Sequence, residues 1–106
     1  MRITYDKLVR DGIPAIIAAD GGQACTRVLD QGSYRTALHD KLLEEAREAR
    51  EASGPQLMSE LADLLEVVRG LAGAYGIEWE SIEAEAARKR ADRGGFDQRI
   101  FLEYVD

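Results

Sequence analysis

The sequence predicts an all-α domain in which an antiparallel helical hairpin is followed by a further helix. Alanine, leucine, glutamate and arginine dominate the 106 residues, and aromatic residues make up only 7%, a composition that favours helices over sheets. Apolar residues recur at helical spacing over residues 33–52, 55–75 and 78–91. Glycine and proline separate these segments, so each one is expected to be a separate helix.

Local signals predict where the long helices begin and end. Ser33 is suited to cap the first of them. Gly54-Pro55 supplies a stop followed by a proline that fits a first helical turn, and so short a connection predicts an antiparallel hairpin. The second long helix is expected to end at Gly76 and the last helix at Gly94-Gly95.

Shorter elements are expected in the N-terminal region and near the C-terminus. Asp11 can cap a short helix whose first turn contains Pro14 and which stops at Gly21-Gly22. Residues 24–29 and 99–105 alternate weakly and contain β-branched members, so they can pair as a small two-stranded sheet. Cys25 is then a small apolar residue of the first strand, and a single cysteine excludes an internal disulfide.

Size and charge limit the range of functions. No repeat, low-complexity tract or linker divides the chain, which predicts a single domain over residues 1–106 with one modest core, completed by a second subunit. The formal net charge of −6 disfavours binding to a nucleic-acid polymer. The sequence has no signal-like segment and no apolar run of about 18 residues, so a cytoplasmic protein that does not bind membranes is expected.

Four carboxylates lie in or beside the apolar stripes of the two long helices. Glu45 falls inside the stripe of the first helix and Glu48 at its edge, because positions i and i+3 are neighbours on a helix surface. Glu60 and Asp63 lie at the margin of the second stripe. That second stripe comprises Leu57, Leu61, Leu64, Leu65, Val68, Leu71, Ala72 and Tyr75.

Two such acidic pairs, facing each other across a hairpin, need positive charge between them. An ionised carboxylate in a helix interface is costly unless a cation or strong donors compensate it. Mg²⁺ prefers oxygen ligands and keeps positions for phosphates, with Mn²⁺ as an alternative. Zinc would favour histidine or cysteine, and the only histidine, His39, lies outside this face. Glu44, Glu51 and Glu66 are expected to be solvated charges.

Basic side chains gather near the end of the last helix. Lys89, Arg90 and Arg93 continue the face that begins with the apolar residues Trp79, Ile82 and Ala86. Each cation alone fits the helix macrodipole, but three on one side suit oligophosphate binding. Lys7 and Arg10 form a second basic group, which we also assign to substrate binding.

The chain resembles a known enzyme superfamily over nearly its whole length. Residues 41–48 and 60–65 resemble the E-x-x-E and E-x-x-D signature of the all-α nucleoside triphosphate pyrophosphohydrolases, which include MazG-like proteins, dimeric dUTPases and phosphoribosyl-ATP pyrophosphohydrolase. Residues 5–14 and 89–96 resemble a MazG-like branch of house-cleaning pyrophosphatases. One departure is the gap of eleven residues between the acidic pairs, at the short end of the usual range.

The resemblance implies a MazG-like helical bundle that is a homodimer or homotetramer. It implies that Glu45, Glu48, Glu60 and Asp63 bind magnesium and that Lys89, Arg90 and Arg93 lie near the phosphates. The expected reaction is Mg²⁺-dependent hydrolysis of nucleoside triphosphates, including non-canonical ones, to a monophosphate and pyrophosphate. Either Glu45 or Glu48 is expected to orient the attacking water as general base.

Two alternatives remain at this point. Phosphoribosyl-ATP pyrophosphohydrolase of histidine biosynthesis uses similar chemistry on a larger substrate. A non-catalytic acidic helical module for dimerisation or partner binding differs in predicting no dependence on divalent metal.

Overall fold

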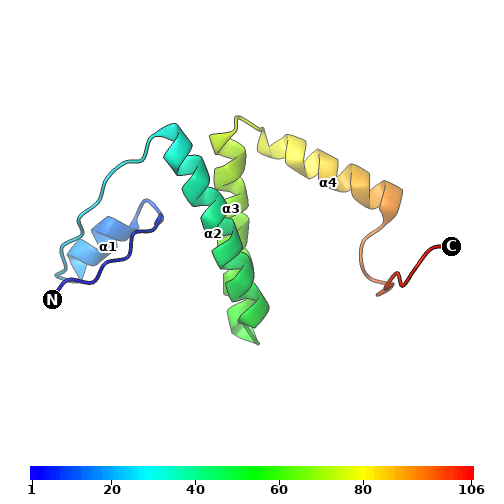
Figure 1. Ribbon diagram of the computed structural model, residues 1–106, viewed down its shortest axis with the longest axis horizontal. Helices are drawn as coiled ribbons and strands as arrows, with labels where there is room; N and C mark the ends of the chain where they lie inside the picture. The colour runs from blue at the N-terminus through cyan, green and yellow to red at the C-terminus, as the bar shows by residue number, and fades with distance from the viewer.

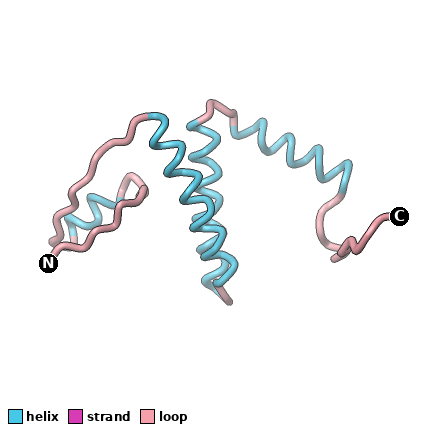
Figure 2. The backbone as a smooth tube through the Cα atoms, in the orientation of Figure 1, coloured by secondary structure: helices cyan, strands magenta, loops and turns pink.

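The computed structural model describes residues 1–106 and consists of four helices and no strand (Figures 1 and 2). These helices are α1 (Ile13–Ala19), α2 (Gln31–Glu51), α3 (Pro55–Ala74) and α4 (Trp79–Arg93). The predicted all-α class and the antiparallel hairpin, formed by α2 and α3, are confirmed. Helix α4 contacts α3 only near their junction, and α1 and α4 lie on opposite sides of the hairpin (Figure 1). No helix has the combination of length and apolar character that crossing a bilayer requires.

Helix α2 begins three residues before the predicted start. Its N-cap is Asp30, whose Oδ1 accepts a hydrogen bond from the Ser33 backbone N–H at 2.8 Å. The prediction of Ser33 as the cap was wrong because Ser33 is the third helical residue, where its N–H needs an acceptor. The same hydrogen bond lowers the pKa of Asp30 below its ordinary value.

We expect Asp30→Ala to destabilise α2, because a free N–H group at the helix start loses its acceptor. The melting temperature is expected to fall by about 4 °C or more for a domain of this size. Thermal unfolding followed by circular dichroism measures this effect. Asp40→Ala, which changes an exposed acidic residue in the middle of the same helix, is the matched control. Equal melting temperatures for the two variants would show that the cap is not important.

The other helix ends follow their predicted signals with one exception. The N-cap of α1 is Gly12, without a side-chain cap, so the prediction of Asp11 in that role was wrong. Gly54, Gly76 and Gly94 adopt the positive φ that favours glycine, at the hairpin turn and after α3 and α4. These turns set the direction in which the chain leaves each helix.

The core lies between α2 and α3 and is small. Its buried apolar side chains are Leu38, Val67 and Ala72. Gly70 allows a close approach here, since a Cβ at this position would lie 3.1 Å from Leu38 Cδ2. One side of the predicted α3 stripe remains uncovered in the single chain, with Leu61 50% and Leu65 47% exposed.

The predicted two-stranded sheet is absent. Residues 24–29 precede α2 and residues 99–105 follow α4, so the projecting α4 holds the two segments apart (Figure 2). Arg99 also has a positive φ of 58°, which interrupts an extended conformation. Without a partner strand, neither segment can form the ladder of hydrogen bonds that stabilises a sheet. Cys25 is therefore exposed and not packed in a strand.

Candidate active site

Three carboxylates from the two hairpin helices meet in one place. Glu45 lies on α2, and Glu60 and Asp63 lie one turn apart on the facing side of α3. One carboxylate oxygen from each residue lies within 4.8 Å of the others. The antiparallel packing of α2 and α3 therefore gathers residues that are far apart in the sequence. We call Glu45, Glu60 and Asp63 the acidic triad.

The acidic triad is unusual in its burial. Glu45 is only 6% exposed, and it is the one charged residue buried together with the apolar core. Both Glu45 Oε2 and Glu60 Oε2 are buried without a hydrogen-bond partner. Burial raises the pKa of the Glu45 carboxyl above its ordinary value of 4.5, and neighbouring Glu48 raises it further through hydrogen bonding and repulsion. Such a site requires either a proton or a cation.

Glu48 lies beside the acidic triad but outside it. Its side chain is exposed, one turn after Glu45 on α2, and close enough to Glu45 to raise the pKa of that carboxyl. Of the four carboxylates predicted as metal ligands, three are thus brought together and the fourth is adjacent. A carboxylate in this position is free to accept a proton from water next to the triad.

Two cations of the same chain neutralise part of the acidic triad. Arg10 Nη2 lies 2.7 Å from Asp63 Oδ1, and Lys41 Nζ lies 3.5 Å from Glu45 Oε1. We did not predict a role for Lys41, although its i,i+4 spacing from Glu45 was a readable signal. Only the fold could reveal the Arg10 contact, which joins residues 53 positions apart.

Lys7 lies at the edge of the same region. Its Nζ is 4.0 Å from Glu44 Oε1, so Glu44 is not solely a solvated charge as predicted. Both side chains are well exposed, and a pair this long and exposed contributes little stability. Lys7 and Arg10 are nevertheless both located where the N-terminal segment meets the hairpin.

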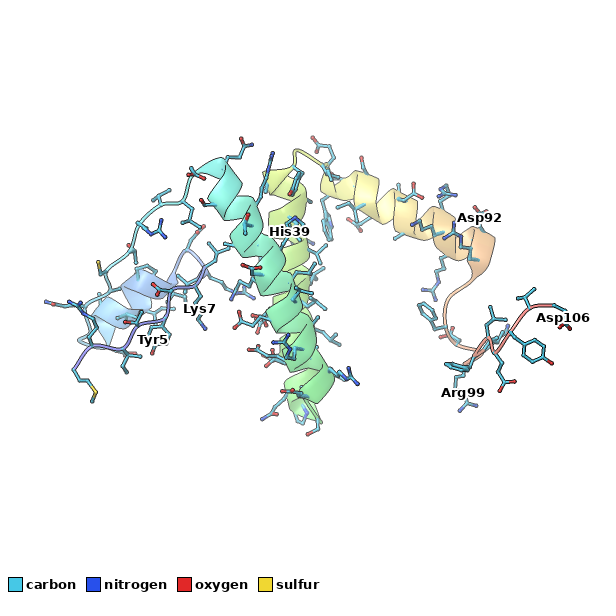
Figure 3. The ribbon with its side chains drawn as sticks, in the orientation of Figure 1. Tyr5, Lys7, His39, Asp92, Arg99 and Asp106 are labelled. Carbon is cyan, nitrogen blue, oxygen red and sulfur yellow. The ribbon has the colours of Figure 1, made fainter.

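The basic residues of α4 are not at the acidic triad of their own chain. Asp92, on the same helix turn as these residues, lies on the far side of the hairpin from Lys7 (Figure 3). Arg88 pairs with Glu85 and Asp92, whereas Lys89, Arg90 and Arg93 make no ion pair. The apolar side of α4 lines an open hollow of about 420 Å³ with Lys89 at one end. These cations are available to another molecule.

Comparison with known proteins identifies the family. A family model described as phosphoribosyl-ATP pyrophosphohydrolase matches residues 26–90, more than half of the chain. The chain belongs to this family. It is therefore a pyrophosphohydrolase, an enzyme that acts on phosphoanhydride bonds. Searches among curated proteins and among solved structures find no match.

Family membership decides between the classes of function. The matched region contains the acidic triad, Glu48 and two of the α4 cations, Lys89 and Arg90. The alternative of a non-catalytic binding module is excluded, because the family is one of enzymes. The predicted membership of the all-α pyrophosphohydrolase superfamily is confirmed.

Proposed function

We propose that this pyrophosphohydrolase cleaves the bond between the α and β phosphates of a nucleotide that carries a triphosphate group. The products are a monophosphate and pyrophosphate, and Mg²⁺ is held by Glu45, Glu60 and Asp63. The observation that carries the proposal is the pair of buried carboxylate oxygens, Glu45 Oε2 and Glu60 Oε2, that have no partner within the protein.

The acidic triad fits a hard divalent cation. It offers carboxylate oxygens only, and three of them lie close enough together to share one ion. Mn²⁺ has the same ligand preference and is an alternative to Mg²⁺. A divalent cation bound here would polarise the phosphoanhydride and make water a stronger nucleophile.

Residues of the chain itself would orient the attacking water. Glu48 is exposed beside the acidic triad and is not one of its three members, which makes it our choice of general base between Glu45 and Glu48. Lys41, whose Nζ is already 3.5 Å from Glu45 Oε1, keeps positive charge beside the acidic triad. No serine or cysteine is needed, because water attacks phosphorus directly.

We further propose that the active enzyme contains at least two copies of the chain. The accessible surface is 9493 Å², whereas a compact monomer of 11.7 kDa would expose about 5,900 Å². The radius of gyration is 18.1 Å, against about 13 Å for a compact domain of this length. Two copies that each covered this excess of about 3,600 Å² would bury about 7,200 Å² in total, which exceeds the roughly 2,000–5,000 Å² of typical obligate homodimer interfaces, so the surplus is large enough for at least one such interface.

A second copy also offers the missing phosphate ligands. The uncovered side of α3, formed by Leu57, Met58, Leu61 and Leu65, is the natural contact surface. Helix α4, which carries Lys89, Arg90 and Arg93, leads away from the hairpin of its own chain (Figure 1), and its cations would reach the acidic triad of a partner. Three cations there would stabilise the negative charge that develops on departing pyrophosphate.

Two substrate classes are compatible with this site. Sequence reasoning favours nucleoside triphosphates, including non-canonical ones. The matched family model carries the name of phosphoribosyl-ATP, so this nucleotide is the second candidate. Both substrates present a triphosphate to the acidic triad, and they differ in the group that must be accommodated beyond it.

Product analysis tests the proposal. The full-length protein is incubated with Mg²⁺ and a panel of canonical triphosphates, damaged triphosphates and phosphoribosyl-ATP. Chromatography identifies the nucleotide product, while separate assays detect pyrophosphate and orthophosphate. We expect a monophosphate and pyrophosphate in equal amounts, with no turnover after chelation of the metal. A nucleoside diphosphate with orthophosphate would place the chemistry at the γ phosphorus and overturn the proposal.

A further inference from the structure

The N-terminal segment, residues 1–12, is held on the helical hairpin through its basic side chains. The polar contacts between them are the Arg10 to Asp63 pair and the Lys7 to Glu44 pair. No backbone hydrogen bond joins residues 1–12 to α2 or α3, and α1 packs against no other helix. Of these two polar contacts the Arg10 pair is the stronger, because its distance of 2.7 Å is much shorter than the 4.0 Å of the Lys7 pair.

Arg10 and the proposed metal ion need the same carboxylate. Asp63 accepts the Arg10 hydrogen bond through Oδ1 and is also one of the three members of the acidic triad. A divalent cation on Asp63 would repel the guanidinium and reduce the negative charge that attracts it. The two cations therefore compete for one group.

We propose that Arg10 is the internal counter-ion of the metal-free acidic triad, and that a divalent cation displaces it and so releases the N-terminal segment. This proposal rests on the proposed metal site. Lys41, the other cation at the triad, lies on α2 next to Glu45, so its displacement moves one side chain. Arg10 and Asp63 are 53 residues apart in the sequence, so displacement of Arg10 would instead free the N-terminal segment from the hairpin.

Linkage makes the competition measurable in both directions. If metal weakens the contact of Arg10 with Asp63, then that contact must weaken metal binding by the same factor. The released guanidinium remains next to the site and can bind phosphate through two parallel hydrogen bonds. Arg10 would thus offset part of the negative charge of the metal-free acidic triad and become a substrate ligand only after the metal has bound.

Calorimetric titration with Mg²⁺ alone tests the first direction. Wild-type protein is compared with Arg10→Ala and with Arg2→Ala, which removes the same charge from the same segment but makes no ion pair. We expect Arg10→Ala to bind Mg²⁺ about 5-fold more tightly than wild type, at the lower end of typical coupling between sites. Arg2→Ala is expected to match wild type.

Limited proteolysis of the wild-type protein tests the second direction. Trypsin cleavage after Arg10, followed by mass spectrometry, is expected to become about 5-fold faster when Mg²⁺ is added, in line with the coupling above. Cleavage after Arg99, which lies in the exposed C-terminal segment, is the internal control and should not respond to Mg²⁺.

Three results would contradict the proposal in different ways. Weaker Mg²⁺ binding by Arg10→Ala would show that Arg10 orients Asp63 for the metal and does not compete with it. Unchanged Mg²⁺ binding together with unchanged cleavage after Arg10 would make the contact a passive structural one. A wild-type protein that binds no Mg²⁺ would overturn this inference and the proposed metal site together.

Discussion

Replacing Glu45 with glutamine is expected to remove metal-dependent hydrolysis and to stabilise the metal-free protein. Glutamine has nearly the same shape, so the packing between α2 and α3 should persist. It carries no charge, however, and it offers the metal only a weak carbonyl ligand. Loss of groups that merely support metal ligands costs about 10- to 100-fold in activity or affinity, so loss of a ligand is expected to cost more than about 100-fold.

Although Glu45→Gln is expected to lose activity, it is expected to gain stability. Glu45 is only 6% exposed and its Oε2 has no hydrogen-bond partner, so its negative charge destabilises the metal-free fold. Removing that charge is expected to raise the melting temperature by about 4 °C in a domain of this size. Added Mg²⁺ should stabilise wild-type protein and have little effect on the variant.

The pH dependence follows from the raised pKa of Glu45. Because the folded state holds this proton more tightly than the unfolded chain does, metal-free wild-type protein should become more stable as the pH falls through the folded-state pKa toward 4.5. Above the folded-state pKa that contribution is lost. The glutamine variant should lack this component of the pH profile.

Turnover and thermal melting, each with and without Mg²⁺, measure these effects. Glu51→Gln is the matched control, since Glu51 is an exposed glutamate near the end of the same helix and has no ion-pair partner. It should behave as wild type in both assays. Wild-type turnover by Glu45→Gln would show that this carboxylate does not bind the catalytic metal.

The double variant Leu61→Glu, Leu65→Glu is expected to separate the subunits and to inactivate the enzyme. Both leucines lie on the uncovered side of α3 and are about half exposed, so covering the rest of each one contributes about 0.8–1.5 kcal/mol. Two carboxylates in their place should weaken association by more than about 100-fold. Activity should fall with assembly, because Lys89, Arg90 and Arg93 would no longer reach a neighbouring acidic triad.

Light scattering at micromolar protein concentration, combined with turnover, measures this loss. Val28→Glu is the control, since Val28 is fully exposed in the segment before α2 and lies outside the proposed contact surface. A wild-type protein that is monomeric and active would contradict the proposal of a site shared between subunits.

Local spacing in the sequence was sufficient to predict the helices and most of the acidic site. The periodicity of apolar residues predicted α2, α3 and α4. The short turn at Gly54-Pro55 predicted that α2 and α3 form an antiparallel hairpin. The i,i+3 spacing of acidic residues on both helices predicted that carboxylates would meet, as Glu45, Glu60 and Asp63 do. These features could be predicted because a helix relates each residue to neighbours only three or four positions away.

Contacts between distant segments were decided by the tertiary structure. Arg10 reaches Asp63 across 53 residues, and no periodicity encodes that distance. Residues 24–29 and 99–105 both had strand character, but a strand needs a partner, and α4 carries the second segment away. The location of Lys89, Arg90 and Arg93 likewise depends on the direction in which the chain leaves α3 after Gly76, which two backbone angles set and the pattern of side chains does not.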